Sequence, residues 1–355
     1  MPDRRVRVRP IRHITNRINP LSQRTILVTG GAGYIGSHVV RQLGAAGERV
    51  LVLDNLGKGF RQAVTAGELV VGEVGDYALV SRLMAEHQVD TVMHFAAHTI
   101  VPESVALPLK YYGNNTCSTR NLLQACLDNH VAHFVFSSTA AVYGMPDQGY
   151  ADEESPTRPI NAYGTSKLMS EWMLRDVAAV NPLRYVALRY FNVAGSDPGG
   201  RIGQATPGAT LLTKVACEAM VGKRTHISVF GTDYPTPDGT GVRDYIHVED
   251  LASAHLRALD YLRAQGRSVT LNVGYGHGYS VRDVLAMVQA VGGKPLEIRE
   301  EARRAGDPAY LVARAERIRA ELGWQPAYDD LRAIVTHSLA WERKLLRDPW
   351  SKAPA

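Results

Sequence analysis

Thr29-Gly30-Gly31-Ala32-Gly33-Tyr34-Ile35-Gly36 is the stretch that decides the fold. It follows a short apolar run, Arg24–Thr29, which predicts a buried strand, and it precedes a helical pattern from Ser37 to Ala46. Glycines between a strand and a helix allow a tight turn and let backbone N–H groups approach a pyrophosphate at the helix N-terminus. The order of strand, glycine-rich turn and helix therefore predicts a dinucleotide-binding unit, with Gly30, Gly33 and Gly36 at its turn.

The next strand, Arg49–Asp54, ends in an acid 18 residues after Gly36. A carboxylate at this spacing accepts hydrogen bonds from an adenosine ribose and repels a 2′-phosphate, which favours NAD over NADP. Two nearby cations, Lys58 and Arg61, keep NADP open as an alternative.

Strands and helices alternate through the first half of the chain. Strands are predicted at 69–72, 91–95, 131–137 and 184–189, with helices at 77–86, at 109–129 and from Tyr163 to about 179. This alternation predicts an α/β fold with a Rossmann-type, doubly wound parallel sheet. Glu73 follows the third strand and either contacts the adenine or is a surface acid. Phe95-Ala96-Ala97 ends the fourth strand and should pass under the cofactor.

Tyr163 and Lys167 are four residues apart, so on a helix they share one face. A free tyrosine has a pKa of about 10, and a nearby ammonium lowers that pKa by favouring the phenolate. Thr139 lies just after the strand 131–137 and can hydrogen-bond the same substrate hydroxyl. Together the three side chains suit removal of a proton from a sugar or alcohol hydroxyl during hydride transfer.

The second half has a different character. Gly and Pro cluster from Gly195 to Gly208, and the periodicity predicts helices at 211–221, 248–264, 281–290, 314–322 and 331–346 with short strands at 227–230 and 269–273. We expect a NAD-binding domain over 23–190 and a smaller mixed α/β substrate domain over 191–350, with segments near 242–255 and 269–276 packing back on the first domain. Arg243, Arg303 and Arg304 lie in predicted loops, where arginine forks suit phosphate oxygens and Asp307 suits a sugar hydroxyl; surface ion pairing is the alternative.

The net charge of +5 is concentrated at one end. Residues 1–20 hold six of the 40 basic residues and one of the 35 acidic ones, so the remainder carries 34 of each sign. A neutral body argues against nucleic acid as a partner.

Residues 1–22 contain no apolar segment typical of a secretory signal, and we expect them to be a disordered basic extension. No apolar run is long enough to span a membrane. The three cysteines lack metal spacing, and we expect reduced thiols in a cytoplasmic enzyme without a metal site.

Several longer motifs resemble the extended short-chain dehydrogenase/reductase family and, within it, the 4-epimerases that interconvert UDP-glucose and UDP-galactose. The resemblance covers about residues 24–346. It is carried by residues 29–38, Leu53-Asp-Asn-Leu56, Tyr111-Tyr-Gly-Asn-Asn115, Ser137-Ser-Thr-Ala-Ala-Val-Tyr-Gly144, Arg189-Tyr-Phe-Asn192 and, most specifically, residues 230–248.

The resemblance implies a tightly held NAD that is not consumed. Tyr163 would take the 4-hydroxyl proton of a UDP-hexose while C4 gives hydride to the nicotinamide, and the 4-keto sugar would then turn and regain hydride on its other face. Lys167 would hold the nicotinamide ribose and Thr139 the sugar hydroxyl. A homodimer through the helices at 102–129 and 163–179 is also implied.

The same resemblance implies two sets of binding residues. The cofactor set is Gly30, Gly33, Tyr34, Ile35, Gly36, Asp54, Asn55, Leu56, Gly59, Glu73, Val74, Phe95, Ala96, Ala97, Asn114, Thr139, Tyr163, Lys167 and Phe191. The UDP-sugar set is Thr139, Tyr163, Asn192, Leu211, Leu212, Ser228, Val229, Phe230, Arg243, Arg304, Asp307 and Leu311.

The chain departs from the family pattern in four places. Glu73 replaces the usual Asp, Thr99 stands where some members have a cofactor-contacting Lys, and Thr210-Leu211-Leu212 replaces a more polar run near the uridine. Leu311 occupies the position facing the C2 substituent of the sugar, where other members have a bulky Tyr or a small Cys. An intermediate side chain leaves N-acetylhexosamine substrates open as an alternative, and pentose substrates stay open because they would react by the same mechanism.

Two other functions occur on this fold, and the residues argue against both. Dehydratases and decarboxylases of this fold place carboxylates directly after the threonine, whereas this chain has Ala140 and Ala141, whose methyl groups cannot donate a proton. Non-catalytic NAD-binding relatives often lose the tyrosine or the lysine, and this chain keeps both Tyr163 and Lys167.

Overall fold

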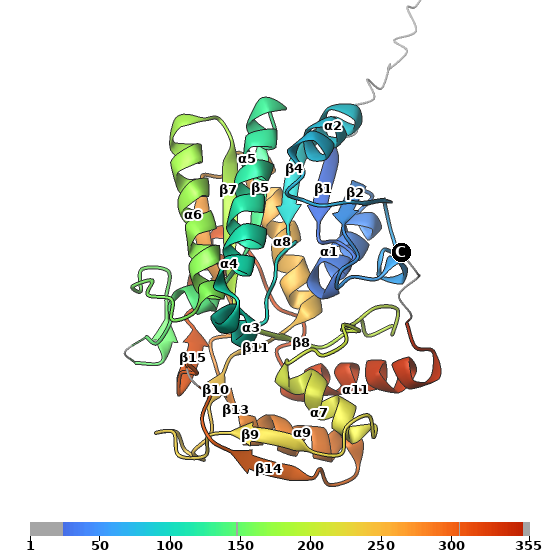
Figure 1. Cartoon of the computed structure of the whole chain (residues 1–355), viewed down its shortest axis with the longest axis vertical. Helices are drawn as coiled ribbons and strands as arrows, with labels where there is room; N and C mark the ends of the chain where they lie inside the picture. The colour runs from blue at the N-terminus through green and yellow to red at the C-terminus, as the bar shows by residue number, and fades with distance from the viewer. Residues whose placement is uncertain (1–23, 147, 305, 351–355) are drawn as a thin grey trace, which may run out of the picture.

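The computed structural model describes residues 24–146, 148–304 and 306–350. The expected basic extension at 1–22 lies outside these ranges. Two regions stand one above the other in Figure 1, a sheet flanked by helices and a smaller mixed region beneath it.

A seven-stranded parallel sheet forms the larger region, which confirms the predicted fold class. Apolar runs with β-branched residues favour buried strands of this kind, because helices cover both faces. The order β12-β7-β5-β4-β1-β2-β3 changes direction between β1 and β4, which creates a crevice at their carboxyl ends. The strands are β1 (Thr25–Thr29), β2 (Arg49–Asp54), β3 (Glu68–Val71), β4 (Val89–His94), β5 (His133–Thr139), β7 (Arg184–Tyr190) and β12 (Val269–Val273).

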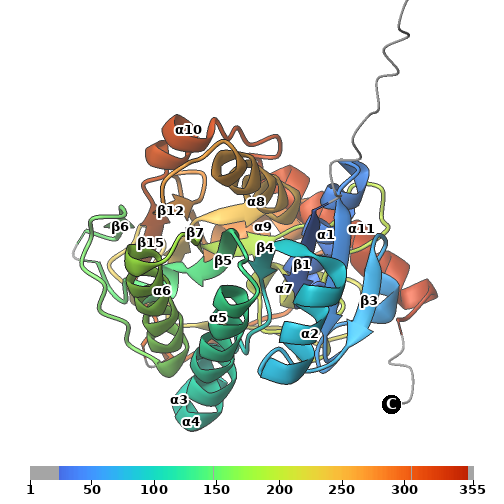
Figure 2. The same cartoon turned by 90° about the horizontal axis from the view of Figure 1, so that it is seen from above.

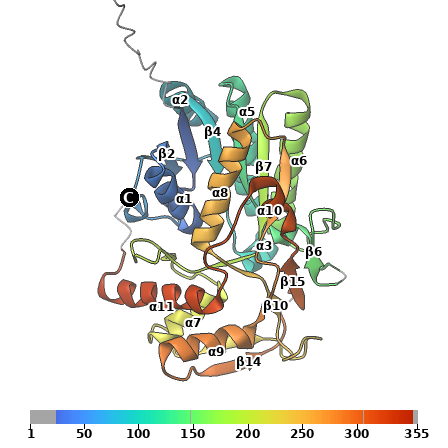
Figure 3. The same ribbon diagram turned by 180° about the vertical axis from the view of Figure 1, so that it is seen from behind.

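Helices bury their apolar stripes on the two faces of this sheet (Figures 2 and 3). One face carries α1 (Tyr34–Ala45), α8 (Val248–Arg263) and α10 (Glu316–Leu322), and its core is continuous with that of the smaller region. The other face carries α2 (Tyr77–His87), α5 (Ser118–Asp128) and α6 (Ala162–Val180) over a separate core. The short helix η1 (Arg61–Ala63) follows β2.

The smaller region is assembled from segments that are distant in the chain. One layer contains α7 (Leu212–Met220), α9 (Val281–Gly292), α11 (Leu331–Arg347) and the parallel pair β9 (Ile227–Phe230) and β14 (Ile298–Glu301). A four-stranded sheet in the order β13-β10-β15-β6 joins β13 (Tyr279–Ser280), β10 (Val242–Arg243), β15 (Tyr310–Ala313) and β6 (Tyr150–Ala151). The parallel pair β8 (Asn192–Ala194) and β11 (Tyr245–His247) leads from the large sheet into this region.

Segments cross between the two regions in both directions. The strand predicted at 269–273 is β12, the edge of the large sheet, and α8 packs on α1, β5 and β7. In the opposite direction β6, from the first half of the chain, joins the small sheet, which the sequence did not indicate. Sequence position alone therefore does not separate the two regions.

Two predicted helices were wrong in detail. The first begins at Tyr34 rather than Ser37, because Gly33 is its N-cap and Tyr34–Gly36 form its first turn. The chain is helical from 108 to 128, close to the predicted 109–129, but a π-helical turn, η2 (Tyr112–Cys117), separates α4 (Pro108–Tyr111) from α5, and an unpredicted helix α3 (Val101–Ala106) precedes them.

The π-helical turn is held by Asn115 rather than by local propensity. His98 N donates to Asn115 Oδ1 at 2.8 Å, and Asn115 Nδ2 donates to Ser166 Oγ on α6 at 3.0 Å. Widened turns of this kind are typical of functional sites. The turn ties the segment after β4 to the helix that carries Tyr163.

Candidate active site

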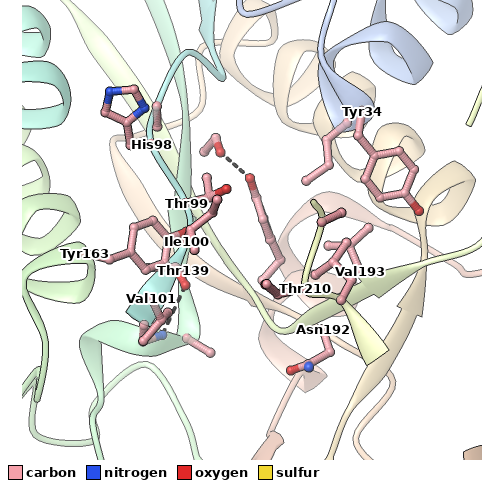
Figure 4. Close-up of a pocket in the computed structure, with 18 of the residues that line it drawn as sticks. Tyr34, His98, Thr99, Ile100, Val101, Thr139, Tyr163, Asn192, Val193 and Thr210 are labelled. Atoms are coloured by element: carbon pink, nitrogen blue, oxygen red, sulfur yellow. Dashed lines mark hydrogen bonds between the residues drawn. The ribbon is translucent and has the colours of Figure 1, made fainter. Parts of the chain in front are cut away.

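A cavity of about 440 Å³ opens at the crevice between β1 and β4. Its walls come from both regions of the molecule, as expected for a ligand site at a reversal of strand order. Figure 4 shows Tyr163 and Thr139 on one side of it and Tyr34 on the opposite side.

The glycine-rich turn forms one end of the cavity. Gly30 has φ +72°, and a Cβ on it would lie 2.6 Å from Ala96 N, so only glycine fits between β1 and the segment after β4. A Cβ on Gly36 would lie 2.3 Å from Gly30 O. Gly33 caps α1 without a side-chain hydrogen bond, which leaves the helix N-terminus open toward an anion.

Asp54 supports this turn from the end of β2. Its Oδ2 accepts from Ala32 N at 3.0 Å and its Oδ1 accepts from Leu56 N at 2.8 Å. Burial raises the pKa of Asp54, while these two backbone hydrogen bonds act in the opposite direction. Beside it, Asn55 Nδ2 donates to Glu73 Oε1 at 3.1 Å. The carboxylate is thus held at the strand end where the sequence predicted a ribose contact.

Thr139 and Tyr163 reach the cavity from different elements. Thr139 ends β5 and caps the short helix η3 (Ala140–Val142), with its Oγ1 accepting from Ala141 N at 3.1 Å. Tyr163 lies in the first turn of α6, whose N-cap Asn161 accepts from Gly164 N at 2.9 Å. Both side chains line the cavity, as the sequence predicted for a shared substrate hydroxyl.

Lys167 lies behind Tyr163 rather than at the cavity wall. Its side chain is buried, and its Nζ donates to Ser137 O at 2.8 Å. Burial lowers the pKa of Lys167 to about 7. Burial also raises the pKa of Tyr163, and the hydrogen bond with the Thr139 hydroxyl opposes that rise. In this structure the threonine therefore moves the tyrosine pKa in the direction that the sequence analysis expected of the lysine.

The opposite end of the cavity carries the predicted substrate side chains. Asn192, Leu211, Arg243, Asp307 and Leu311 line it. The Arg243 guanidinium pairs with Asp307 Oδ1 at 3.2 Å, joining β10 to the loop before β15. An arginine and a carboxylate at one end offer partners for phosphate oxygens and sugar hydroxyls.

The structure brings together one part of the predicted set. The predicted residues at the cavity wall are Gly30, Gly33, Tyr34, Ile35, Gly36, Phe95, Ala97, Thr139, Tyr163, Phe191, Asn192, Leu211, Arg243, Asp307 and Leu311. The predicted residues away from the wall are Asp54, Asn55, Leu56, Gly59, Glu73, Val74, Ala96, Asn114, Lys167, Leu212, Ser228, Val229, Phe230 and Arg304. Val229 is a core side chain, so only its backbone could face a ligand.

Arg304 and Phe230 pair with each other outside the cavity wall, with the guanidinium 3.6 Å from the ring centroid. The cavity wall also contains residues outside the predicted cofactor and substrate sets, among them Lys58, His98, Ile160, Tyr190, Gln204 and Thr206. The glycine- and proline-rich run at 195–208 was the signal that could have indicated Gln204 and Thr206, because such runs form loops near ligands.

The described residues were also compared with the expectations for cysteines, metal ligands and membrane-spanning helices. The three cysteines are free thiols, with Cys126 and Cys217 buried and Cys117 exposed. Across the residues described, three or more His, Cys, Asp or Glu side chains do not gather as a metal would require. Within the same ranges, no helix is both long and apolar enough to cross a bilayer.

Residues 26–274 match the family described as NAD dependent epimerase/dehydratase. The chain is 55% identical to a UDP-glucose 4-epimerase from Azospirillum brasilense, over 90% of this chain and 92% of the relative. A crystal structure of UDP-glucose 4-epimerase from Brucella ovis in complex with NAD superposes with a TM-score of 0.87 at 41% identity, over 89% of this chain and 98% of that one. The UDP-Glc/GlcNAc 4-epimerase from Campylobacter jejuni gives a TM-score of 0.80 at 47% identity, over 90% and 99%.

Proposed function

The chain belongs to the NAD dependent epimerase/dehydratase family, and we propose that it interconverts UDP-glucose and UDP-galactose by inverting C4 of the sugar. One observation carries this function: Thr139 and Tyr163 face a single cavity that extends from the glycine-rich turn to the Arg243–Asp307 pair. A cofactor and a sugar nucleotide would meet at those two hydroxyl groups.

The residues at the turn fit NAD. Gly33 leaves the start of α1 without a side chain, so a pyrophosphate could approach the backbone N–H groups there, and the Asp54 carboxylate at the end of β2 suits the two ribose hydroxyls of NAD. Phe95 and Phe191 line the cavity between this turn and Tyr163. NAD supplies, when bound, a reversible acceptor for the hydride of C4.

Tyr163 handles the proton in this reaction. The phenolate of Tyr163 takes the proton of the 4-hydroxyl as C4 is oxidised, and the phenol so formed returns that proton when the 4-keto group is reduced on its other face. Thr139 hydrogen-bonds the same sugar oxygen and holds it beside Tyr163. Lys167, buried behind the tyrosine, donates to Ser137 O, and its ammonium favours the phenolate form of Tyr163. Arg243 and Asp307 hold the nucleotide diphosphate and a sugar hydroxyl while the ketone turns.

The residues after Thr139 support epimerisation over elimination. Ala140 and Ala141 line the cavity at the positions where an acid would have to protonate a leaving hydroxyl. A 4-keto sugar formed here meets only methyl groups at those positions, and its simplest fate is reduction back to the alcohol.

A product assay tests the function directly. Purified protein is incubated with UDP-galactose, UDP-N-acetylgalactosamine and UDP-xylose in parallel, with NAD supplied, and the sugar nucleotides are separated. We expect UDP-glucose from the first reaction and no 4-keto-6-deoxy product. Conversion of none of the three would refute the function, and preference for the second or third would reassign the substrate to an N-acetylhexosamine or a pentose.

We also propose that the chain works as a cytoplasmic homodimer in galactose metabolism. Large apolar side chains lie exposed on α4 and α6, with Leu109 81% and Trp172 46% exposed. An apolar surface on neighbouring helices supports a contact between copies. Light scattering should give twice the mass of the chain, and Leu109→Glu should shift it toward the monomer.

A further inference from the structure

Glu171 is the third residue on the face of α6 that carries Tyr163 and Lys167. It follows Lys167 by four residues, so it lies one helical turn further along the same face. Its side chain is 5% exposed. A buried carboxylate beside a proposed catalytic pair requires partners, because an unpaired buried charge is strongly unfavourable.

Two partners come from neighbouring strands. Arg189 on β7 donates to the carboxylate in a fork, with Nη2 2.6 Å from Oε2 and Nε 3.0 Å from Oε1. Ser138 Oγ on β5 also donates to Oε1. Ser138 precedes Thr139 directly, so the carboxylate joins the helix of Tyr163 to the strand of Thr139.

Lys167 lies between Glu171 and the cavity. Its Nζ is 4.9 Å from the Phe136 ring centroid and donates to Ser137 O. Burial lowers the pKa of Lys167, and the negative charge of Glu171 opposes that change. Without this carboxylate, burial would favour the neutral amine more strongly, and the Ser137 carbonyl and the Phe136 ring would remain as the groups that favour the ammonium.

The other titratable groups around this face do not replace that charge. Burial raises the pKa of the nearby tyrosines, and it lowers the pKa of His94 to about 3, so His94 is neutral at pH 7. The groups that face Lys167, Glu171 or their hydrogen-bond partners from α6, β7, β4 and the segment after β5 are Tyr163, Arg189, Tyr185, Tyr190, His94 and Tyr143.

We propose that Glu171 is a positioning residue for the epimerisation proposed above: its carboxylate is a buried negative charge one helical turn from Lys167, and it holds Ser138, and with it Thr139, against the helix of Tyr163. The inference rests on that proposed function. It assigns Arg189 the role of balancing Glu171, so that the carboxylate stays ionised in a buried position.

Glu171→Gln tests the charge while keeping the size of the side chain. We expect kcat for UDP-galactose to fall at alkaline pH, with the alkaline limb of the kcat profile displaced by about one pH unit toward lower pH and KM unchanged. At pH 9 this corresponds to a loss in kcat of roughly tenfold. A profile that coincides with that of the parent would overturn the proposal.

A matched control separates the site effect from general destabilisation. Glu342 is also a buried glutamate, paired with Lys214 and with Lys223 at 2.9 Å, but it lies on α11. Glu342→Gln should lower the unfolding midpoint and leave the alkaline limb unmoved. Equal displacement of the limb in both variants would also overturn the proposal.

Glu171→Asp provides a second variant should the glutamine form fail to fold. It keeps the charge but withdraws the carboxylate from Ser138, so the limb should stay in place while the kcat plateau falls severalfold. An aspartate variant with the parental plateau would contradict the positioning role. An inactive parent would instead refute the proposed function, so the two failures are distinguishable.

Discussion

The two ends of the cavity are built in different ways. At the reacting end Tyr163, Lys167 and Glu171 come from one helix, and their polar atoms are buried among fixed hydrogen bonds. At the nucleotide end Arg243 and Asp307 come from segments 64 residues apart, and the Asp307 side chain is 44% exposed. The contrast indicates that the reacting groups are positioned before substrate binds, whereas the exposed charges can exchange partners with the ligand.

The largest effect should follow from Tyr163→Phe at the buried end. The variant keeps the ring but removes the only hydroxyl proposed to carry the proton, so kcat should fall by about 10²–10⁴-fold while KM changes little. Steady-state kinetics with UDP-galactose measures both parameters. If the variant keeps the parental kcat, Tyr163 does not carry the proton, and the buried end of the cavity is not the reacting end.

Arg243→Ala should act differently, because it changes the exposed end. Loss of a charge-assisted hydrogen bond to the substrate costs about 1.5–3 kcal/mol, so KM should rise by about 10- to 150-fold with a smaller change in kcat. The same kinetic assay measures it. Arg257→Ala, an exposed arginine paired with Asp260 on α8, is the control and should leave KM unchanged. A change confined to kcat would mean that the nucleotide end of the cavity acts on the chemical step rather than on substrate binding.

Acid should lower the free energy of unfolding through two buried histidines. Burial lowers the pKa of His94 to about 3 and that of His255 to about 4, against about 6.5 in the unfolded chain. The unfolded state therefore binds more protons below pH 6.5, and stability is fully present above that pH and is lost as pH falls. At pH 5 each histidine should cost roughly 2 kcal/mol of unfolding free energy.

Urea titrations at pH 7.5 and pH 5 measure this loss. Exposed ion pairs such as Arg303–Asp233 should contribute little to it, since surface pairs are worth about 0–1 kcal/mol. Equal midpoints at the two pH values would show that these histidines are protonated in the folded state.

The smallest effect concerns the choice of sugar. Leu311, 8% exposed, lines the nucleotide end of the cavity, where the C2 substituent is expected. Leu311→Tyr should exclude N-acetylated substrates and Leu311→Ala should admit them, with changes in relative kcat/KM of about tenfold. Competition between UDP-galactose and UDP-N-acetylgalactosamine measures the ratio. Unchanged ratios in both variants would place the C2 substituent elsewhere.

The sequence was most informative where function depends on neighbours in the chain. The glycine-rich turn, Asp54 at a strand end and the pair Tyr163 and Lys167 follow from the strand–turn–helix order and from the helical period. The parallel sheet follows from the alternation of strands and helices for the same reason. The start of α1 was placed too late because Gly33 caps the helix without a side-chain hydrogen bond, and the π-helical turn was missed because it depends on backbone distant in the chain, at His98.

Local order was sufficient for the strands, the helices, the glycine-rich turn and the spacing of Tyr163 and Lys167, because adjacent residues and short periods set them. Tertiary packing decided that Lys167 is buried behind the cavity and donates to Ser137 O, that β6 joins a sheet formed mainly by the second half, and that Arg243 meets Asp307. Those outcomes depend on burial and on pairing between segments far apart in the chain, and neither is encoded in the spacing of neighbouring residues.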